Sequence, residues 1–96
     1  MDIGRVRVSR DDWKPRLSHG IKAQTVGNEL ILLDKDSRRV HQLDRVGARM
    51  LACCDGASSV DGIVEQLLRE FNVSEKQLLK DVSELLERMR VLGILS

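Results

Sequence analysis

The chain has 96 residues, of which 42% are hydrophobic and 2% aromatic, and its formal net charge is +1. This length fits one small domain with an aliphatic core and leaves little volume for a deep active-site cavity. The 16 basic and 15 acidic residues nearly cancel, so overall charge draws the chain neither to nucleic acid nor to an anionic membrane. No apolar run approaches the roughly 18 residues of a membrane span, and the start of the chain has no signal-peptide core, so we expect a cytoplasmic protein.

The first half of the chain predicts an arm and a small sheet. Residues 1–20 show neither the two-residue nor the 3.6-residue apolar period, so we expect an irregular N-terminal arm before a domain over residues 21–96. Gly27 and Asn28 tolerate the positive φ of a tight turn and predict a hairpin. The run from Leu30 to Leu33 is entirely apolar, which predicts a central strand covered on both faces. Three strands are expected, the last one short with a free edge, over residues 21–26, 29–34 and 39–43.

The second half of the chain predicts helices, because apolar residues recur at spacings of three and four. Each segment starts with Asp or Ser, whose side chain accepts the orphan amide protons of a helix. Ser74 and Gln77 form a predicted capping box, in which each side chain satisfies a backbone donor of the other. The order of elements predicts an α+β fold, winged helix-turn-helix-like, with a three-stranded antiparallel sheet followed by three helices. The helices are expected from Asp44 to about Cys54, from Ser58 or Ser59 to Asn72, and from Ser74 to Gly93.

Residues that carry chemistry are few and scattered. Cys53 and Cys54 are adjacent, so their side chains diverge on a helix, and we expect small buried thiols rather than a disulfide. Their separation from His19 and His41 matches no zinc-binding pattern. His41 lies on a strand beside Leu43 without a carboxylate nearby in the sequence to orient it, and the sequence has no phosphate-binding loop or nucleophile elbow. We therefore expect no catalytic residue, no metal and no cofactor.

A small sheet with three helices is also the layout of winged-helix DNA-binding proteins. A helix that reads DNA usually presents basic and amide side chains to base edges and phosphates. Here the third predicted helix, from Glu75 to Arg90, balances four basic residues with four acidic ones. This balance disfavours a nucleic-acid partner, and a winged-helix DNA-binding regulator remains the alternative function. A structural or oligomerisation module is a third class.

Two stretches of the sequence resemble the PqqD-like family. They are LDRVGARMLACCDGASSVDGIVEQLLREF, from Leu43 to Phe71, and DVSELLERMRVLGIL, from Asp81 to Leu95. The family pattern has a strand ending in Leu with Asn or Asp, a helix ending in Asp-Gly, a helix capped by Ser or Thr, and a leucine-rich helix ending in Gly-Leu/Ile-Leu. The resemblance covers roughly residues 17–96 and rests on the ordered set of these features.

The resemblance implies a peptide chaperone, also called a RiPP recognition element, which is not itself an enzyme. Such a domain binds the leader of a ribosomally made precursor peptide as an added strand and presents it to a modifying enzyme. In pyrroloquinoline quinone (PQQ) biosynthesis that enzyme is a radical S-adenosylmethionine protein. We expect these partners, no membrane partner, and a monomer or weak homodimer. The implied peptide-binding residues are Arg39, Val40, His41, Gln42 and Leu43 on the strand edge, and Lys76, Leu79, Lys80, Ser83, Leu86 and Arg90 on the third helix.

The residues themselves leave a simpler interpretation open for part of this set. Leu43, Leu79 and Leu86 all belong to the apolar periodic pattern, so each could be a core residue rather than a peptide contact. His41 stands where related domains often have an aromatic residue, which leaves the identity of the leader open.

Overall fold

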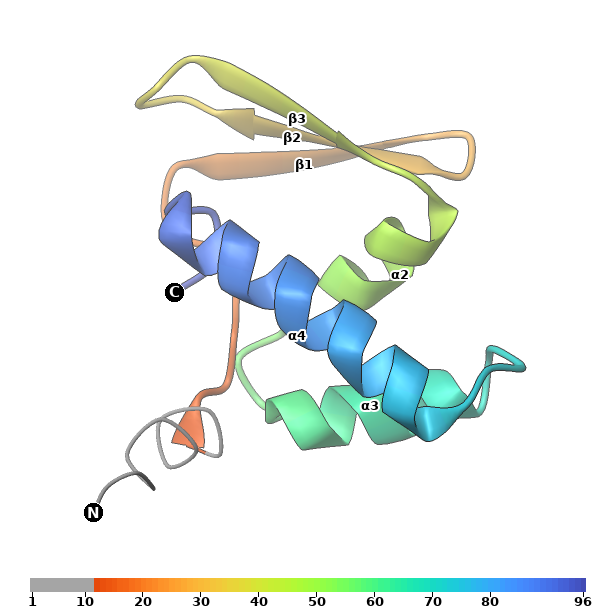
Figure 1. The fold of residues 1–96 in the computed structure, drawn as a ribbon. Coiled ribbons are helices and arrows are strands. Elements are labelled where there is room, and N and C mark those ends of the chain that lie inside the picture. Colours follow the sequence, from red (N-terminus) through yellow and green to blue (C-terminus); the bar gives the residue numbers. More distant parts are fainter. Residues whose placement is uncertain (1–11) are drawn as a thin grey trace.

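A computed structural model describes residues 12–96, and in it three strands form one antiparallel sheet in the order β1-β2-β3 (Figure 1). The strands are β1 (Ile21–Val26), β2 (Glu29–Asp34) and β3 (Arg39–Leu43), with the predicted bounds. β2 is central and β3 lies at an edge, as predicted. The turn between β1 and β2 has Gly27 at φ +63°, a left-handed conformation that glycine adopts without strain.

Three further elements follow the sheet, so the predicted α+β class is confirmed. They are α2 (Arg45–Ala52), α3 (Val60–Leu68) and α4 (Glu75–Val91). Their N-caps are Asp44, Ser59 and Ser74, whose side-chain oxygens accept the amides of Gly47, Gly62 and Gln77 at 2.9, 3.2 and 3.1 Å. Local side-chain chemistry therefore starts each helix where the sequence predicts a start.

Two local predictions need correction. The capping box is half formed, because the Gln77 side-chain amide donates to Asp81 at 2.9 Å, one turn further along α4, and does not reach back to Ser74. The second helix ends at Leu68, not at Asn72. Beyond it, the amide of Glu70 bonds to the carbonyl of Leu67 at 2.9 Å, three residues back, so the chain tightens into a turn before Phe71.

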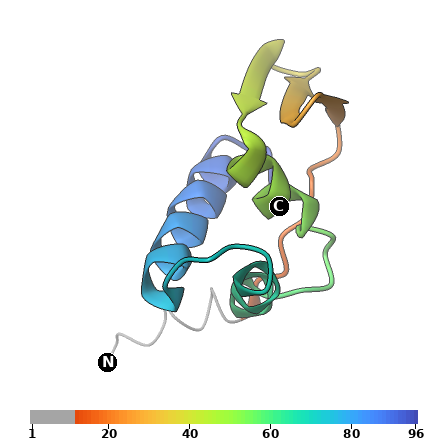
Figure 2. The ribbon, with the colours of Figure 1, turned by 90° about the vertical axis from the view of Figure 1, so that its right-hand side faces the viewer.

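The elements stack with α2 in the middle. This helix packs against β2 and β3 on one side and against α3 and α4 on the other (Figures 1 and 2). Leu32 from the sheet and Ile63, Leu67, Val82 and Leu86 from the helices are fully buried in one aliphatic cluster. Trp13 and Phe71 pack at its margin. The core therefore holds the sheet on one side of the helices.

The prediction that β2 is covered on both faces is wrong. Leu32 points toward the helices and is 0% exposed, whereas Ile31 and Leu33 point to the opposite face and are only half-buried. Val40, which pairs with Leu33, is 62% exposed. No described element packs on this outer face. Antiparallel sheets commonly leave one face to solvent, and here neighbouring side chains give the apolar residues partial cover.

The segment before β1 runs along the C-terminal tail. The amide of Arg16 bonds to the carbonyl of Ser96 at 3.2 Å, the amide of Ser96 bonds to the carbonyl of Arg16 at 2.9 Å, and the amide of Ser18 bonds to the carbonyl of Ile94 at 2.8 Å. Residues 1–11 of the predicted arm lie outside the described residues, and the division at residue 20 stays a prediction. Within residues 12–96 no helix combines the length and the hydropathy needed to cross a membrane.

Candidate functional site

The outer edge of β3 is unpaired among the described residues. β3 bonds to β2 on one side only, so along its other side the backbone presents amide donors and carbonyl acceptors. Alternate side chains point to opposite faces of the sheet: His41 and Leu43 face the helices, and Val40 and Gln42 face outward. The Gln42 amide donates to the carboxylate of Glu29 on the same outer face. An extended peptide can therefore reach the edge without displacing an element of the fold.

A groove of about 470 Å³ opens where β3 ends. Residues of α2 form its floor. Asp81, Leu85 and Arg88 of α4 form the opposite wall, because residues at i, i+4 and i+7 lie on one face of a helix. Gly47 lies in the floor, and a Cβ there would stand 3.3 Å from the Leu43 side chain, so glycine lets the end of β3 approach α2 closely. The groove is lined by Gln42, Leu43, Asp44, Val46, Gly47, Met50, Asp81, Leu85 and Arg88.

The groove combines an apolar floor with a charged rim. Leu43, Met50 and Leu85 are buried core residues whose surfaces reach the groove, and Val46 is 40% exposed. On the rim, Asp81 accepts a hydrogen bond from Gln77, and Arg88 has no ion-pair partner among the described residues. Such a surface can hold apolar side chains of a bound chain and orient its charges.

The structure brings together only part of the predicted peptide-binding set. Gln42 and Leu43 line the groove, and Arg39, Val40 and His41 continue along the same strand edge. Leu43 also belongs to the core cluster, which confirms its role as a core residue, while its contact with a peptide stays a prediction.

The six residues predicted on the helical wall do not line the groove. Leu86 is 0% exposed and belongs to the core, and Leu79 is half-buried against it. Arg90 lies over the Trp13 ring, 5.2 Å from its centroid, and the Ser83 hydroxyl is buried without a hydrogen-bond partner. The side chains of Lys76 and Lys80 are exposed. A role for these six residues in peptide binding stays a prediction.

The α4 residues that do line the groove were missed by the sequence reasoning. Asp81, Leu85 and Arg88 line the groove but are absent from the predicted peptide-binding set. The apolar spacing of α4 could have indicated them. Leu85 lies at one margin of the buried stripe, and Asp81 and Arg88, four residues before it and three after it, lie just outside that margin. Which flank of the stripe faces β3 is decided by how the helices pack.

The thiols offer no reactive nucleophile. Cys53 and Cys54 are both buried and unbridged, which confirms the prediction of small buried thiols. Burial raises the pKa of Cys54 to about 12, and nearby Cys53 and Asp55 add to the rise. Burial likewise raises the pKa of Cys53. The Cys54 thiol donates to the carbonyl of Met50 at 3.4 Å. Residues 12–96 contain no group of three or more His, Cys, Asp or Glu side chains placed to hold a metal ion.

Comparison with known proteins gives a family match and a structural match. The family described as "Coenzyme PQQ synthesis protein D (PqqD)" matches residues 29–95. TbiB1, solved with the TbiA(beta) leader peptide, superposes with a TM-score of 0.78 at 20% identity, over 84% of this chain and 94% of that one. Lasso peptide synthetase B1, complexed with the leader peptide, gives 0.78 at 20% identity, over 88% and 99%. The heterocyclase TruD gives 0.62 at 19% identity, over 86% of this chain but 11% of that one. None of the curated protein sequences matches this chain.

Proposed function

Because the chain belongs to the PqqD family, we propose that it binds the leader segment of a ribosomally made precursor peptide and presents it to a peptide-modifying enzyme. The leader adds as a strand to the free edge of β3 and continues into the groove between β3, α2 and α4. The chain itself is not the catalyst.

One observation carries this proposal: an edge of β3 that pairs with no other described strand leads directly into a groove with an apolar floor. Strand addition draws affinity from main-chain hydrogen bonds, each worth about 0.5–1.5 kcal/mol, and specificity from side-chain pockets. Here the strand edge from Arg39 to Leu43 supplies the main-chain hydrogen bonds. The side-chain pocket is formed by Leu43, Val46, Met50 and Leu85. A leader with an apolar side chain placed just beyond its β-paired residues fits this layout.

Two further facts support a binding role. The structures of TbiB1 and lasso peptide synthetase B1, which share this fold, were both solved with leader peptides. The buried thiols have raised pKa values and are protonated at neutral pH, so they do not act as nucleophiles. The modification of the precursor peptide is then catalysed by a partner enzyme. We propose that this partner is a radical S-adenosylmethionine enzyme of PQQ biosynthesis or of a related peptide-modifying pathway.

The test is a titration of the ¹⁵N-labelled chain with synthetic leader segments of candidate precursor peptides, together with calorimetry. We expect the largest amide shifts in residues 39–43 and at Asp81, Leu85 and Arg88. A scrambled leader of the same composition is the matched control. Shifts concentrated on Lys76, Lys80 and Arg90 would favour the predicted wall over the groove. Shifts confined to α3, with the β3 edge silent, would contradict the proposed site.

A further inference from the structure

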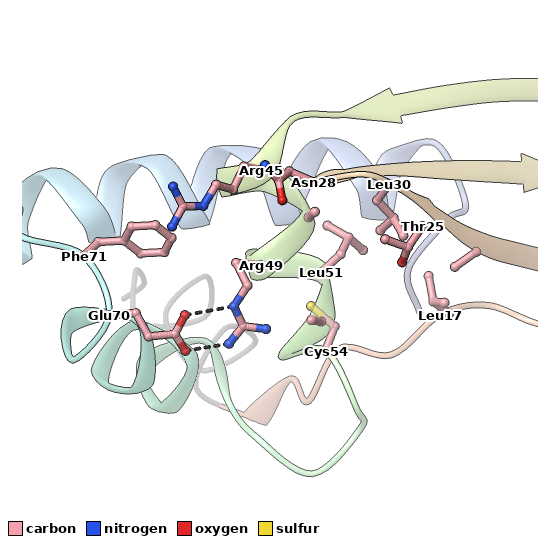
Figure 3. Close-up of a pocket in the computed structure, with 13 residues that line it drawn as sticks. Leu17, Thr25, Asn28, Leu30, Arg45, Arg49, Leu51, Cys54, Glu70 and Phe71 are labelled. Carbon is pink, nitrogen blue, oxygen red and sulfur yellow. Dashed lines mark hydrogen bonds and ion pairs between the residues drawn. The ribbon is translucent and has the colours of Figure 1, made fainter.

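A second and larger cavity lies on the face of α2 opposite the groove. It measures about 640 Å³, and we call it the β1-side pocket (Figure 3). Its lining includes Ala23, Thr25, Leu30, Arg45, Arg49 and Phe71. α2 presents Arg45, Ala48, Arg49 and Ala52 to this pocket and Val46, Gly47 and Met50 to the groove. The two hollows can therefore be occupied at the same time.

The pocket exists because the sheet extends beyond the helices. α2 packs under β2 and β3, and no described helix packs under β1. Ala23 and Thr25 point to the helix side of the sheet yet are exposed. Leu30 and Phe71 add apolar surface to the lining. Phe71 is one of the two aromatic residues of the chain, and its side chain is only half-buried. A hollow that combines apolar side chains with a few polar and charged groups is a common form of binding site.

The charges in the pocket do not cancel. Arg49 donates to both carboxylate oxygens of Glu70, at 2.8 and 2.5 Å, a pairing that raises the pKa of Arg49 and lowers the pKa of Glu70 (Figure 3). Arg45 has no ion-pair partner among the described residues. It lies in the first turn of α2, where the helix dipole disfavours a cation, so its charge does not stabilise the helix. Within residues 12–96, the pocket thus offers one uncompensated positive charge beside its apolar side chains.

From this combination we infer that the β1-side pocket docks an acidic, apolar-anchored segment of the enzyme that modifies the leader. This inference rests on the proposed function, because a leader-presenting domain must contact the enzyme without closing its peptide groove. An apolar side chain of the segment packs against Phe71, and a carboxylate pairs with Arg45, which lies beside Phe71 (Figure 3). Leader and enzyme are then held on opposite faces of one helix.

The first experiment uses defined probes. The ¹⁵N-labelled chain is titrated with the peptides acetyl-Phe-Glu-Leu-Glu-amide and acetyl-Phe-Lys-Leu-Lys-amide. We expect the acidic peptide to shift the amides of Ala23, Thr25, Ala48 and Ala52, with affinity about two- to fivefold above that of the lysine peptide, the range of an exposed ion pair. Arg45→Glu should reverse the preference. Equal responses to both peptides, or shifts confined to the groove, would overturn the inference.

The second experiment separates this inference from the proposed function. A leader peptide that the wild type binds and the enzyme that modifies it are titrated separately into Arg45→Glu, Ala23→Trp and the charge-reversal control Lys35→Glu, which lies in the exposed β2–β3 turn. We expect both pocket variants to lose enzyme affinity and keep leader affinity, and the control to keep both. Wild-type enzyme affinity in both pocket variants, once circular dichroism shows them folded, sinks the inference and leaves leader binding intact. Failure of the wild type to bind any of the candidate leaders overturns the proposed function instead.

Discussion

Proline substitution at two adjacent positions of β3 tests strand addition directly. In an antiparallel sheet, neighbouring residues alternate between directing their backbone groups toward the partner strand and directing them away. His41 and Gln42 are adjacent in β3, and β2 is the one strand paired with β3 in the described part of the chain. One of the two amides therefore faces β2 and the other faces the opposite edge of β3. Proline removes the amide donor at either position. Of His41→Pro and Gln42→Pro, one therefore damages the sheet and the other damages the docking edge.

The expected size of each effect follows from the hydrogen bond that is lost. At the outward position, the loss of one leader hydrogen bond is worth about 0.5–1.5 kcal/mol, which weakens leader binding about two- to twelvefold. The proline ring adds a steric penalty to this loss. At the inward position the ladder with β2 is broken, so the main effect is a lower free energy of unfolding. His41→Ala and Gln42→Ala remove the same side chains but keep the amides, and each proline variant is compared with its alanine partner.

Leader affinity is measured by calorimetry, and the free energy of unfolding by urea denaturation followed by circular dichroism. Strand addition requires that one proline variant, relative to its alanine partner, stays folded and loses leader affinity. If both proline variants fold and bind the leader within twofold of their alanine partners, the leader does not pair with β3. The groove would then have to account for binding by side-chain contacts alone.

Three further predictions concern stability and reactivity. Leu86→Ala should lower the free energy of unfolding by about 2–5 kcal/mol, because Leu86 is 0% exposed, and half-buried Leu79→Ala should lower it less. If urea denaturation shows that Leu86→Ala and Leu79→Ala lower the free energy of unfolding equally, the deeper burial of Leu86 is contradicted. The pKa of Asp34 is lowered by hydrogen bonds from Ser37, and that of Glu70 by Arg49, so the unfolded state binds these protons more readily. Stability should therefore be full above about pH 5 and fall as pH drops below about 4; a free energy of unfolding unchanged between pH 6 and pH 3 would contradict this. Native Cys54, with a pKa of about 12, should resist thiol-specific labelling at pH 8 and react once unfolded in urea.

Local chemistry was enough to predict the elements. All three strands have the predicted bounds, because the turn at Gly27 and Asn28 and the apolar run from Leu30 to Leu33 are short-range signals. Asp44 and Ser74 cap their helices as predicted, since a capping side chain bonds to amides only two or three residues away. The apolar spacing within each helix likewise predicted the core. The resemblance to a family that binds peptides was visible at the same level, as an ordered set of these local features.

The tertiary structure decided which surfaces are available. Four consecutive apolar residues, Leu30 to Leu33, suggested cover on both faces of β2, but the helices pack on one face only. Periodicity marked the buried stripe of α4 without telling which flank of it faces β3. Packing of α4 against α2 and α3 turns Asp81, Leu85 and Arg88 toward the groove, while Leu86, the next residue, is buried in the core. A rotation of 100° per residue separates these neighbours, and only contacts between elements distant in the sequence determine the rotation of a helix about its axis.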